Sequence, residues 1–231
     1  MIEDNSRRSF IGNTIKAAAI VSLGGVMFSC KGKDDDNEKH VSPPEDLMQE
    51  HGLLNRILLI YDKSIADAAT KLGIQNMQLY NAAGILRTFV EDYHERQEEQ
   101  YLFPRFQKAN QLTDLVSTLL QQHNAGRALT DQILQLSKGS SLTQADTQKL
   151  VSLLTRFNIM YRPHEAREDT ILFPAFRKLV SNHEYDSLGE EFEKNETKKF
   201  GKDGFESVLA KVADIEKALG IYELAQFTPQ V

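Results

Sequence analysis

The feature that most constrains this chain is an internal repeat. Residues 94–106 read HERQEEQYLFPRF and residues 164–176 read HEAREDTILFPAF, so seven of thirteen positions are identical at an offset of 70 residues. A second pair repeats as well, because His51 and His123 lie 72 residues apart, each directly after a Glu or a Gln. A repeated unit of this kind predicts two similar helical hairpins related by a pseudo-twofold axis, which brings equivalent positions together at the centre.

Apolar residues recur at steps of three and four between residues 45 and 181, which indicates helices with one buried face. No segment alternates with the period of two that a strand requires. Gly73 and Gly139 follow two of the helices, and Thr143 is placed to cap the last. The expected helices cover approximately residues 45–71, 76–109, 112–138 and 143–181. The predicted fold class is therefore all-α, an antiparallel up-down four-helix bundle with a short helical C-terminal extension over residues 182–231 that packs on it.

The composition agrees with this fold and narrows the chemistry. Of 231 residues, 41% are hydrophobic, enough for one domain with a sizeable core. The net charge of -6 gives no basic footprint, so we expect no nucleic-acid partner. Cys30 is the single cysteine, which excludes an internal disulfide framework and a multi-cysteine metal site. Any metal ligands must then be His, Asp or Glu.

The first thirty residues resemble an export signal. Arg7 and Arg8, followed by Ser9 and Phe10, are similar to a twin-arginine signal. The apolar stretch over 17–28 is shorter than the roughly 20 residues that span a membrane, and it fits the apolar region of a signal better. Met-Phe-Ser-Cys at its end resembles a lipobox with Cys30 as the lipid-modified residue. A soluble exported protein cleaved elsewhere is the alternative.

A charged run follows the signal, so residues 31–44 are expected to be a solvated tether. Its Lys-then-acid order resembles a signal that sends some lipoproteins to the outer leaflet of the outer membrane. The expected localisation is export by the twin-arginine route and lipid anchoring in the cell envelope, on the periplasmic or the outer-membrane face.

Two histidines are each followed four residues later by a glutamate, His94 by Glu98 and His164 by Glu168. This spacing places imidazole and carboxylate on one helix face. The other two helices contribute one histidine each. A two-metal site in a bundle needs inward-pointing ligands from all four helices and carboxylates able to bridge. The predicted metal ligands are His51, His94, Glu98, His123, His164 and Glu168.

The same residues could also have a purely structural role. A lone histidine on an apolar face is more often a hydrogen-bonded core residue than a ligand, but the repetition of the pattern favours a metal site, because burying four imidazoles and two carboxylates without metal is costly. Glu95 and Glu165 are either extra ligands or solvent-exposed. Nearby tyrosines are either hydrogen-bond donors to the ligands or core residues: Tyr61, Tyr93 and Tyr161. His40 and His183 are not assigned to the site.

The mixed nitrogen and oxygen ligand set suits iron, manganese or zinc better than calcium or magnesium. The pattern of His51, His94, Glu98, His123, His164 and Glu168, with both Leu-Phe-Pro runs, resembles the hemerythrin-like HHE cation-binding domain over about residues 45–181. The resemblance implies a centre of two iron ions, with another divalent metal as the alternative, that meets a small diatomic ligand (O2 or NO) or peroxide. Oxygen-carrying hemerythrins use five histidines, whereas this chain offers four, which puts reversible O2 carriage in doubt.

Three functions are consistent with these features. The first is a redox-active di-iron protein that binds or reacts with O2, NO or peroxide. The second is an iron or cation buffering or storage protein without turnover, and the third is a structural helical bundle without metal. No nucleophile–base pair or phosphate-binding loop supports hydrolytic or transfer chemistry. A metal-binding protein is expected rather than a dedicated enzyme.

Overall fold

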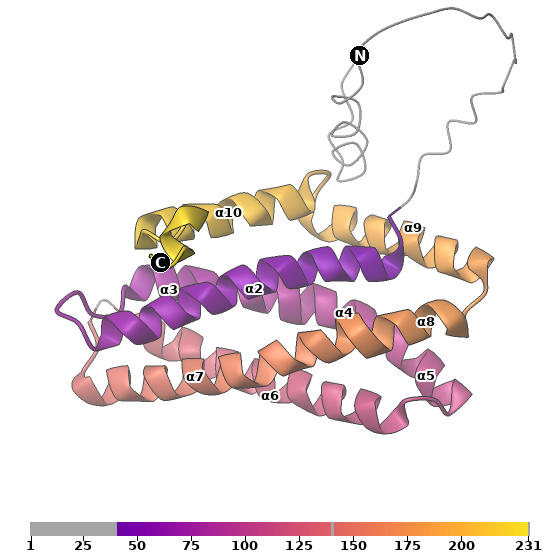
Figure 1. Ribbon diagram of the computed structural model, residues 1–231, viewed down its shortest axis with the longest axis horizontal. Helices are drawn as coiled ribbons and strands as arrows, with labels where there is room; N and C mark the ends of the chain where they lie inside the picture. The colour runs from indigo at the N-terminus through magenta and orange to yellow at the C-terminus, as the bar shows by residue number, and fades with distance from the viewer. Residues whose placement is uncertain (1–40, 140, 231) are drawn as a thin grey trace, which may run out of the picture.

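A computed structural model describes residues 41–139 and 141–230, and in these residues the chain is helical and contains no strand. Figure 1 shows the helices lying side by side along the long axis of the molecule. Four helical segments come first, and two further helices follow them. The first is α2 (Pro43–Ala68). The second begins with α3 (Asn76–Ile85) and continues through η1, α4 and η2 to the end of α5 at Ala109. The third is α6 (Thr113–Ser137), and the fourth begins with α7 (Gln144–Arg167) and continues through η3 to the end of α8 at Leu179. The last two are α9 (Asn182–Phe200) and α10 (Gly204–Leu219).

The helices begin where the sequence supplies caps. The Ser42 hydroxyl accepts a hydrogen bond from the Glu45 backbone N–H, and the Glu45 carboxylate accepts one from the Ser42 backbone N–H, which closes a capping box at the start of α2. Thr143 and Asp146 form the same box at the start of α7. Gly73 has a φ of 68°, the left-handed conformation that favours glycine in the turn before α3.

Each of the first four segments packs on two others. α2 contacts α7 and α3, and α6 contacts α7 and α3, so the four segments surround one interior. Gly126 of α6 packs against Tyr161 of α7. A Cβ atom on Gly126 would lie 2.1 Å from the Tyr161 hydroxyl oxygen, so a larger residue would force the tyrosine to shift.

Two of the four segments contain π-helical turns, which the apolar periodicity does not predict. They are η1 (Leu86–His94) and η2 (Glu98–Leu102), separated by α4 (Glu95–Gln97), and η3 (Glu168–Leu172). After η2 and η3 the chain returns to α-helix as α5 (Phe103–Ala109) and α8 (Phe173–Leu179), each with proline in its first turn. π-Helical turns are frequent at functional sites, and η2 and η3 begin at Glu98 and Glu168.

The apolar core is divided into two clusters. One contains Leu53, Phe89, Phe157 and Tyr161 among many others, and the second contains Leu47, Phe103, Phe106, Phe173 and Phe176 among others. A belt of buried polar side chains, which includes all six predicted ligands, lies on the helices between them. The two clusters thus close both ends of a polar interior.

The last two long helices cover one side of the molecule. α9 contacts α2, and α10 contacts α2 and α3. Val208, Val212 and Ile215 of α10 join the first core cluster, and Arg56 of α2 donates from Nε to Glu216 of α10 at 2.9 Å. A short 3-10 turn, η4 (Leu224–Phe227), follows and is exposed.

The predicted signal and tether lie largely outside the described residues. Arg7, Arg8 and Cys30 fall within residues 1–40, so their predicted roles stay predictions. Within the described ranges, no helix combines the length and the apolar character that crossing a membrane would require.

Candidate metal centre

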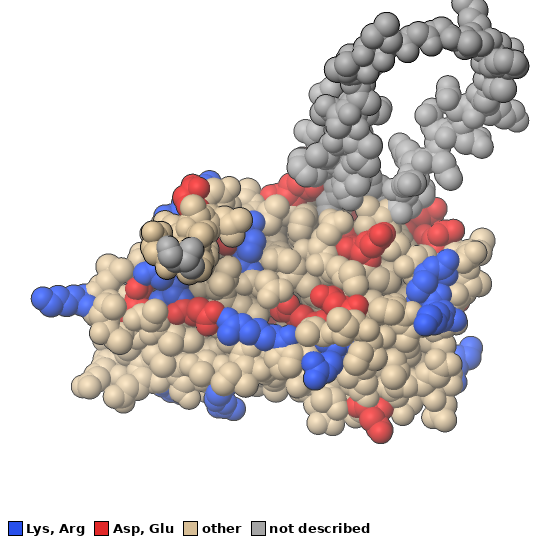
Figure 2. All heavy atoms as spheres, viewed as in Figure 1, with Lys and Arg blue, Asp and Glu red and all other residues tan. Residues whose placement is uncertain are grey.

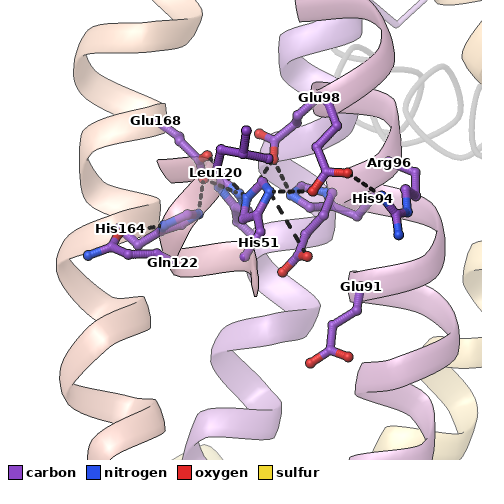
Figure 3. Close-up of polar contacts among 12 residues, drawn as sticks. His51, Glu91, His94, Arg96, Glu98, Leu120, Gln122, His164 and Glu168 are labelled. Carbon is purple, nitrogen blue, oxygen red and sulfur yellow. Dashed lines mark hydrogen bonds and ion pairs between the residues drawn. The ribbon is translucent and has the colours of Figure 1, made fainter. Parts of the chain in front are cut away.

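The structure brings the six predicted ligands together from four helical segments. His51 comes from α2, His94 ends η1, His123 comes from α6 and His164 comes from α7. Glu98 and Glu168 begin η2 and η3. All six side chains are buried, and both glutamates are fully excluded from solvent. Figure 3 shows the imidazoles and the carboxylates pointing toward one another in the interior.

Both carboxylates lie between histidines of different helices. Glu168 Oε2 is 3.1 Å from His164 Nε2 and 3.3 Å from His51 Nε2. Glu98 Oε2 is 3.4 Å from His123 Nε2 and 3.8 Å from His94 Nε2. His123 Nε2 is also 4.0 Å from Glu168 Oε1. Each glutamate therefore faces histidines of both repeats, as a carboxylate that bridges two ions must.

Buried polar atoms in this centre have no hydrogen-bond partner among the described residues. They are the Nε2 atoms of His51 and His123 and both carboxylate oxygens of Glu98 and of Glu168. An unsatisfied buried polar atom costs about 1–3 kcal/mol, so six of them at one point require an explanation. Two sets of ligand atoms lie close enough to hold an ion, one from His51, His94 and Glu98 and the other from His123, His164 and Glu168. The donor set fits two metal ions.

The Nδ1 atom of each of the four predicted ligand histidines lies within hydrogen-bond distance of an acceptor oxygen. His94 Nδ1 is 2.8 Å from Glu50 and His51 Nδ1 is 2.7 Å from Asp169. His123 Nδ1 is 3.1 Å from Glu99, and His164 Nδ1 is 2.9 Å from Gln122. A carboxylate or amide oxygen at Nδ1 fixes the proton there and leaves Nε2 with its lone pair directed inward, which is how metal-binding histidines are oriented in proteins.

The pKa values show how crowded the charges are without metal. Burial raises the pKa of Glu98, and the negative charge of Glu168 raises it further. Burial also acts to raise the pKa of Glu168, but the charges and contacts of His164 and His51 outweigh it and lower that pKa. Burial lowers the pKa of His123 to about 4. Glu98 therefore tends to retain a proton that a metal ion would displace.

The phenylalanines of the two Leu-Phe-Pro runs cover the centre at one end. Phe173 stacks on the His51 ring with 5.6 Å between centroids, and Phe103 stacks on the His123 ring at 5.5 Å. Phe106 and Phe176 pack beyond them, with ring centroids 6.1 Å apart. The repeated motif thus supplies apolar packing that excludes water from the ligands.

Glu95 and Glu165 are buried, which excludes the alternative that they are solvent-exposed. The Glu95 carboxylate accepts a hydrogen bond from the Tyr161 hydroxyl at 2.6 Å and pairs with Arg127 at 2.7 Å. Glu165 accepts from Asn55 at 2.5 Å, and burial raises its pKa to about 7. These partners hold both carboxylates beside the centre, and a direct ligand role stays a prediction.

The three tyrosines near the ligands are all buried, and they differ in their contacts. Tyr161 donates to Glu95, and its ring lies 5.2 Å from that of His164. Tyr93 donates to the Phe192 carbonyl at 3.3 Å, and the Tyr61 hydroxyl has no hydrogen-bond partner among the described residues. His183 is exposed on α9, away from the ligands, and His40 is outside the described residues.

The acceptors at Nδ1 were not predicted, although the repeat carries a signal for them. Each of the four stands next to a ligand in the sequence. Glu50 and Gln122 directly precede His51 and His123, and Glu99 and Asp169 directly follow Glu98 and Glu168. Each of these four residues contacts the Nδ1 atom of a histidine on another helical segment, so the pairing is visible only in the folded structure.

Comparison with known proteins agrees with this geometry. The model of the family described as hemerythrin HHE cation binding domain matches residues 42–176. The uncharacterized protein Rv1995 of Mycobacterium tuberculosis (strain ATCC 25618 / H37Rv) is 43% identical over an alignment 231 residues long. The alignment covers 96% of this chain and 91% of that protein. The uncharacterized protein Mb2018 of Mycobacterium bovis matches to the same extent. No solved structure matches significantly. The chain therefore belongs to the hemerythrin HHE cation-binding family.

Proposed function

We propose that this protein holds two iron ions, bridged by Glu98 and Glu168, in an antiparallel four-helix bundle formed by α2 to α8, and that it binds or reacts with O2, NO or peroxide. The observation that carries the proposal is the convergence of buried histidine nitrogens and carboxylate oxygens that have no hydrogen-bond partner among the described residues. Membership of a cation-binding family supports it.

The donor set favours a transition metal or zinc over calcium or magnesium. Four imidazoles and two carboxylates suit iron, manganese or zinc, whereas calcium and magnesium prefer oxygen ligands. Four histidines and two carboxylates would be shared between two ions, and coordination positions would remain for an external ligand. When bound, a pair of iron ions supplies the electrons and the open coordination that O2, NO and peroxide chemistry require.

The residues of the chain provide orientation and exclusion of water. Glu50, Asp169, Glu99 and Gln122 fix the four imidazole rings through Nδ1. The aromatic rings stacked on His51 and His123 close the apolar end. This burial favours a small ligand over a large one, because a large substrate could not reach the ligand atoms without displacing closely packed side chains.

We also propose that the protein acts in the cell envelope. The twin-arginine pattern at Arg7 and Arg8 and the lipobox ending at Cys30 support export and lipid anchoring. A nucleic-acid partner is not proposed, because the net charge is -6 and acidic and basic side chains are interspersed on the face shown in Figure 2.

Metal analysis of variants tests the proposal. Glu98→Ala and Glu168→Ala should each lose most of the bound iron, because each removes a shared ligand, whereas His183→Ala should keep the wild-type amount. Iron-loaded wild-type protein should change its visible spectrum when NO is added. Equal iron loss from all three variants would place the metal elsewhere, and full iron with no response to NO, O2 or peroxide would favour metal storage instead.

A further inference from the structure

The two halves of the metal centre differ in one hydrogen-bond acceptor. His51 and His123 are equivalent in the repeat, and each has a carboxylate at Nδ1, Asp169 for one and Glu99 for the other. His94 and His164 are also equivalent, but their acceptors differ. His94 Nδ1 meets the carboxylate of Glu50, whereas His164 Nδ1 meets the amide oxygen of Gln122.

This difference changes the strength of one ligand. A carboxylate that accepts the Nδ1 proton raises the basicity of the imidazole and strengthens its bond to a metal. Hydrogen bonds to an ionised acceptor are roughly twice as strong as those to a neutral one. His164 is therefore the weaker ligand of the pair, although its own carboxylate neighbour, Glu168, lies as close as 3.1 Å.

A surface cavity lies beside His164. A cavity of about 370 Å³ between α6 and α7 is lined by His164 and Gln122, with Thr118, Pro163 and Arg167 at its exposed side. Buried Leu119 also lines it. Figure 3 shows Gln122 lying against His164. The cavity is therefore bordered by the one predicted ligand whose acceptor is neutral.

We propose that the two metal positions are unequal: the position of His51 and His94 binds its ion first and more tightly, and the position of His123 and His164 binds second and receives the external small molecule. The inference rests on the proposed two-metal function. It assigns Gln122 as the positioning residue that sets the inequality and the α6–α7 cavity as the route of entry.

The unequal affinity of the two metal positions is tested by anaerobic calorimetric titration of the full chain with ferrous iron. Wild-type protein should bind two ions in two steps that differ by about tenfold or more in affinity, the range that acceptors behind metal ligands produce. Gln122→Glu, which is nearly isosteric, should tighten the second step by about tenfold and bring the steps together. Glu50→Gln should weaken the first step by a similar factor.

The matched control is Gln121→Glu, because it adds the same charge one residue away on the exposed face of α6. It should leave both steps unchanged. Two ions bound with equal affinity, or two steps that Gln122→Glu does not alter, would overturn the inference while leaving the two-metal function intact. Binding of no more than one ion by every form would overturn the proposed function and this inference with it.

The entry route has a separate test with azide as the probe. Thr118→Trp fills the exposed side of the cavity, and Gln121→Trp places the same bulk outside it. With iron content unchanged, Thr118→Trp should slow the spectral change on azide addition at least tenfold, and Gln121→Trp should match wild type. Equal azide rates in wild type and Thr118→Trp would show that ligands enter elsewhere.

Discussion

Replacing Glu98 by methionine should stabilise the metal-free protein and destabilise the iron-loaded one. Both Glu98 carboxylate oxygens are buried with no hydrogen-bond partner among the described residues, and burial together with the charge of Glu168 raises the pKa of Glu98. An unsatisfied buried polar group costs about 1–3 kcal/mol, and methionine fills a similar volume without a group that needs a hydrogen-bond partner. We therefore expect metal-free Glu98→Met to gain about 1–3 kcal/mol.

For a chain of this length a gain of that size raises Tm by about 2–12 °C. With iron bound, wild-type protein should become more stable than Glu98→Met. Wild-type protein gains about 2.7 kcal/mol for each site when free iron is at about 100 times the Kd, whereas Glu98→Met lacks a shared ligand and gains far less.

Thermal unfolding followed by circular dichroism, with and without anaerobic ferrous iron, measures both effects. The control is Glu190→Met, which removes an exposed carboxylate 3.9 Å from Lys194 and should change the stability by less than about 0.5 kcal/mol. The reasoning is refuted if metal-free Glu98→Met is less stable than wild type by more than about 1 kcal/mol. It is refuted equally if the variant keeps the wild-type stabilisation by iron.

Three further outcomes are expected. Burial raises the pKa of Glu91 from 4.5 to about 7, so the folded protein keeps a proton that the unfolded chain has lost between these values. Glu91 alone should then lower the stability by up to about 1.4 kcal/mol per pH unit as the pH rises through that window, and Glu91→Gln should reduce the total slope by about that amount in urea unfolding of the metal-free protein. Tyr161→Phe removes the 2.6 Å hydrogen bond to Glu95 and should cost about 1–3 kcal/mol with iron content unchanged by elemental analysis. Gly126→Ala places a Cβ 2.1 Å from the Tyr161 hydroxyl oxygen and should destabilise by about 1–3 kcal/mol; combined with Tyr161→Phe it should cost less than the sum of the two in the same unfolding assay.

The helical fold and the meeting of the ligands follow from patterns that the sequence repeats. Apolar residues at helical spacing identify the buried face of each helix, and the duplicated His-x-x-x-Glu pairs lie on that face. Thr143 and Gly73 mark helix boundaries because capping and left-handed backbone need those residue types. The family assignment rests on the same motifs and is confirmed by the match over residues 42–176.

The π-helical turns and the Nδ1 acceptors were beyond such reasoning. A π turn holds more residues than an α turn, so consecutive side chains such as Glu98 and Glu99 lie closer around the helix axis. This explains how Glu98 meets His123 at Nε2 while Glu99 meets the same ring at Nδ1. Apolar periodicity does not report a local change of helix type that leaves the buried face in place.

The choice between the alternatives for Glu95 and Glu165 could not be made from the sequence for a different physical reason. Both follow a ligand histidine by one residue, and the geometry of a single helix is compatible with a ligand role and with exposure to solvent. Their partners, Arg127 for Glu95 and Asn55 for Glu165, come from neighbouring helices. Pairs between distant positions are not visible in the periodicity of either helix, so the burial of these carboxylates emerges only from the packed structure.

The central claim is a two-metal centre, and iron content per chain tests it most directly. The protein is purified without chelator, loaded anaerobically with ferrous iron, freed of unbound metal and subjected to elemental analysis alongside protein quantification. The account predicts two ions per chain. No bound metal, or a content that does not rise above one ion per chain at saturating iron, would contradict it.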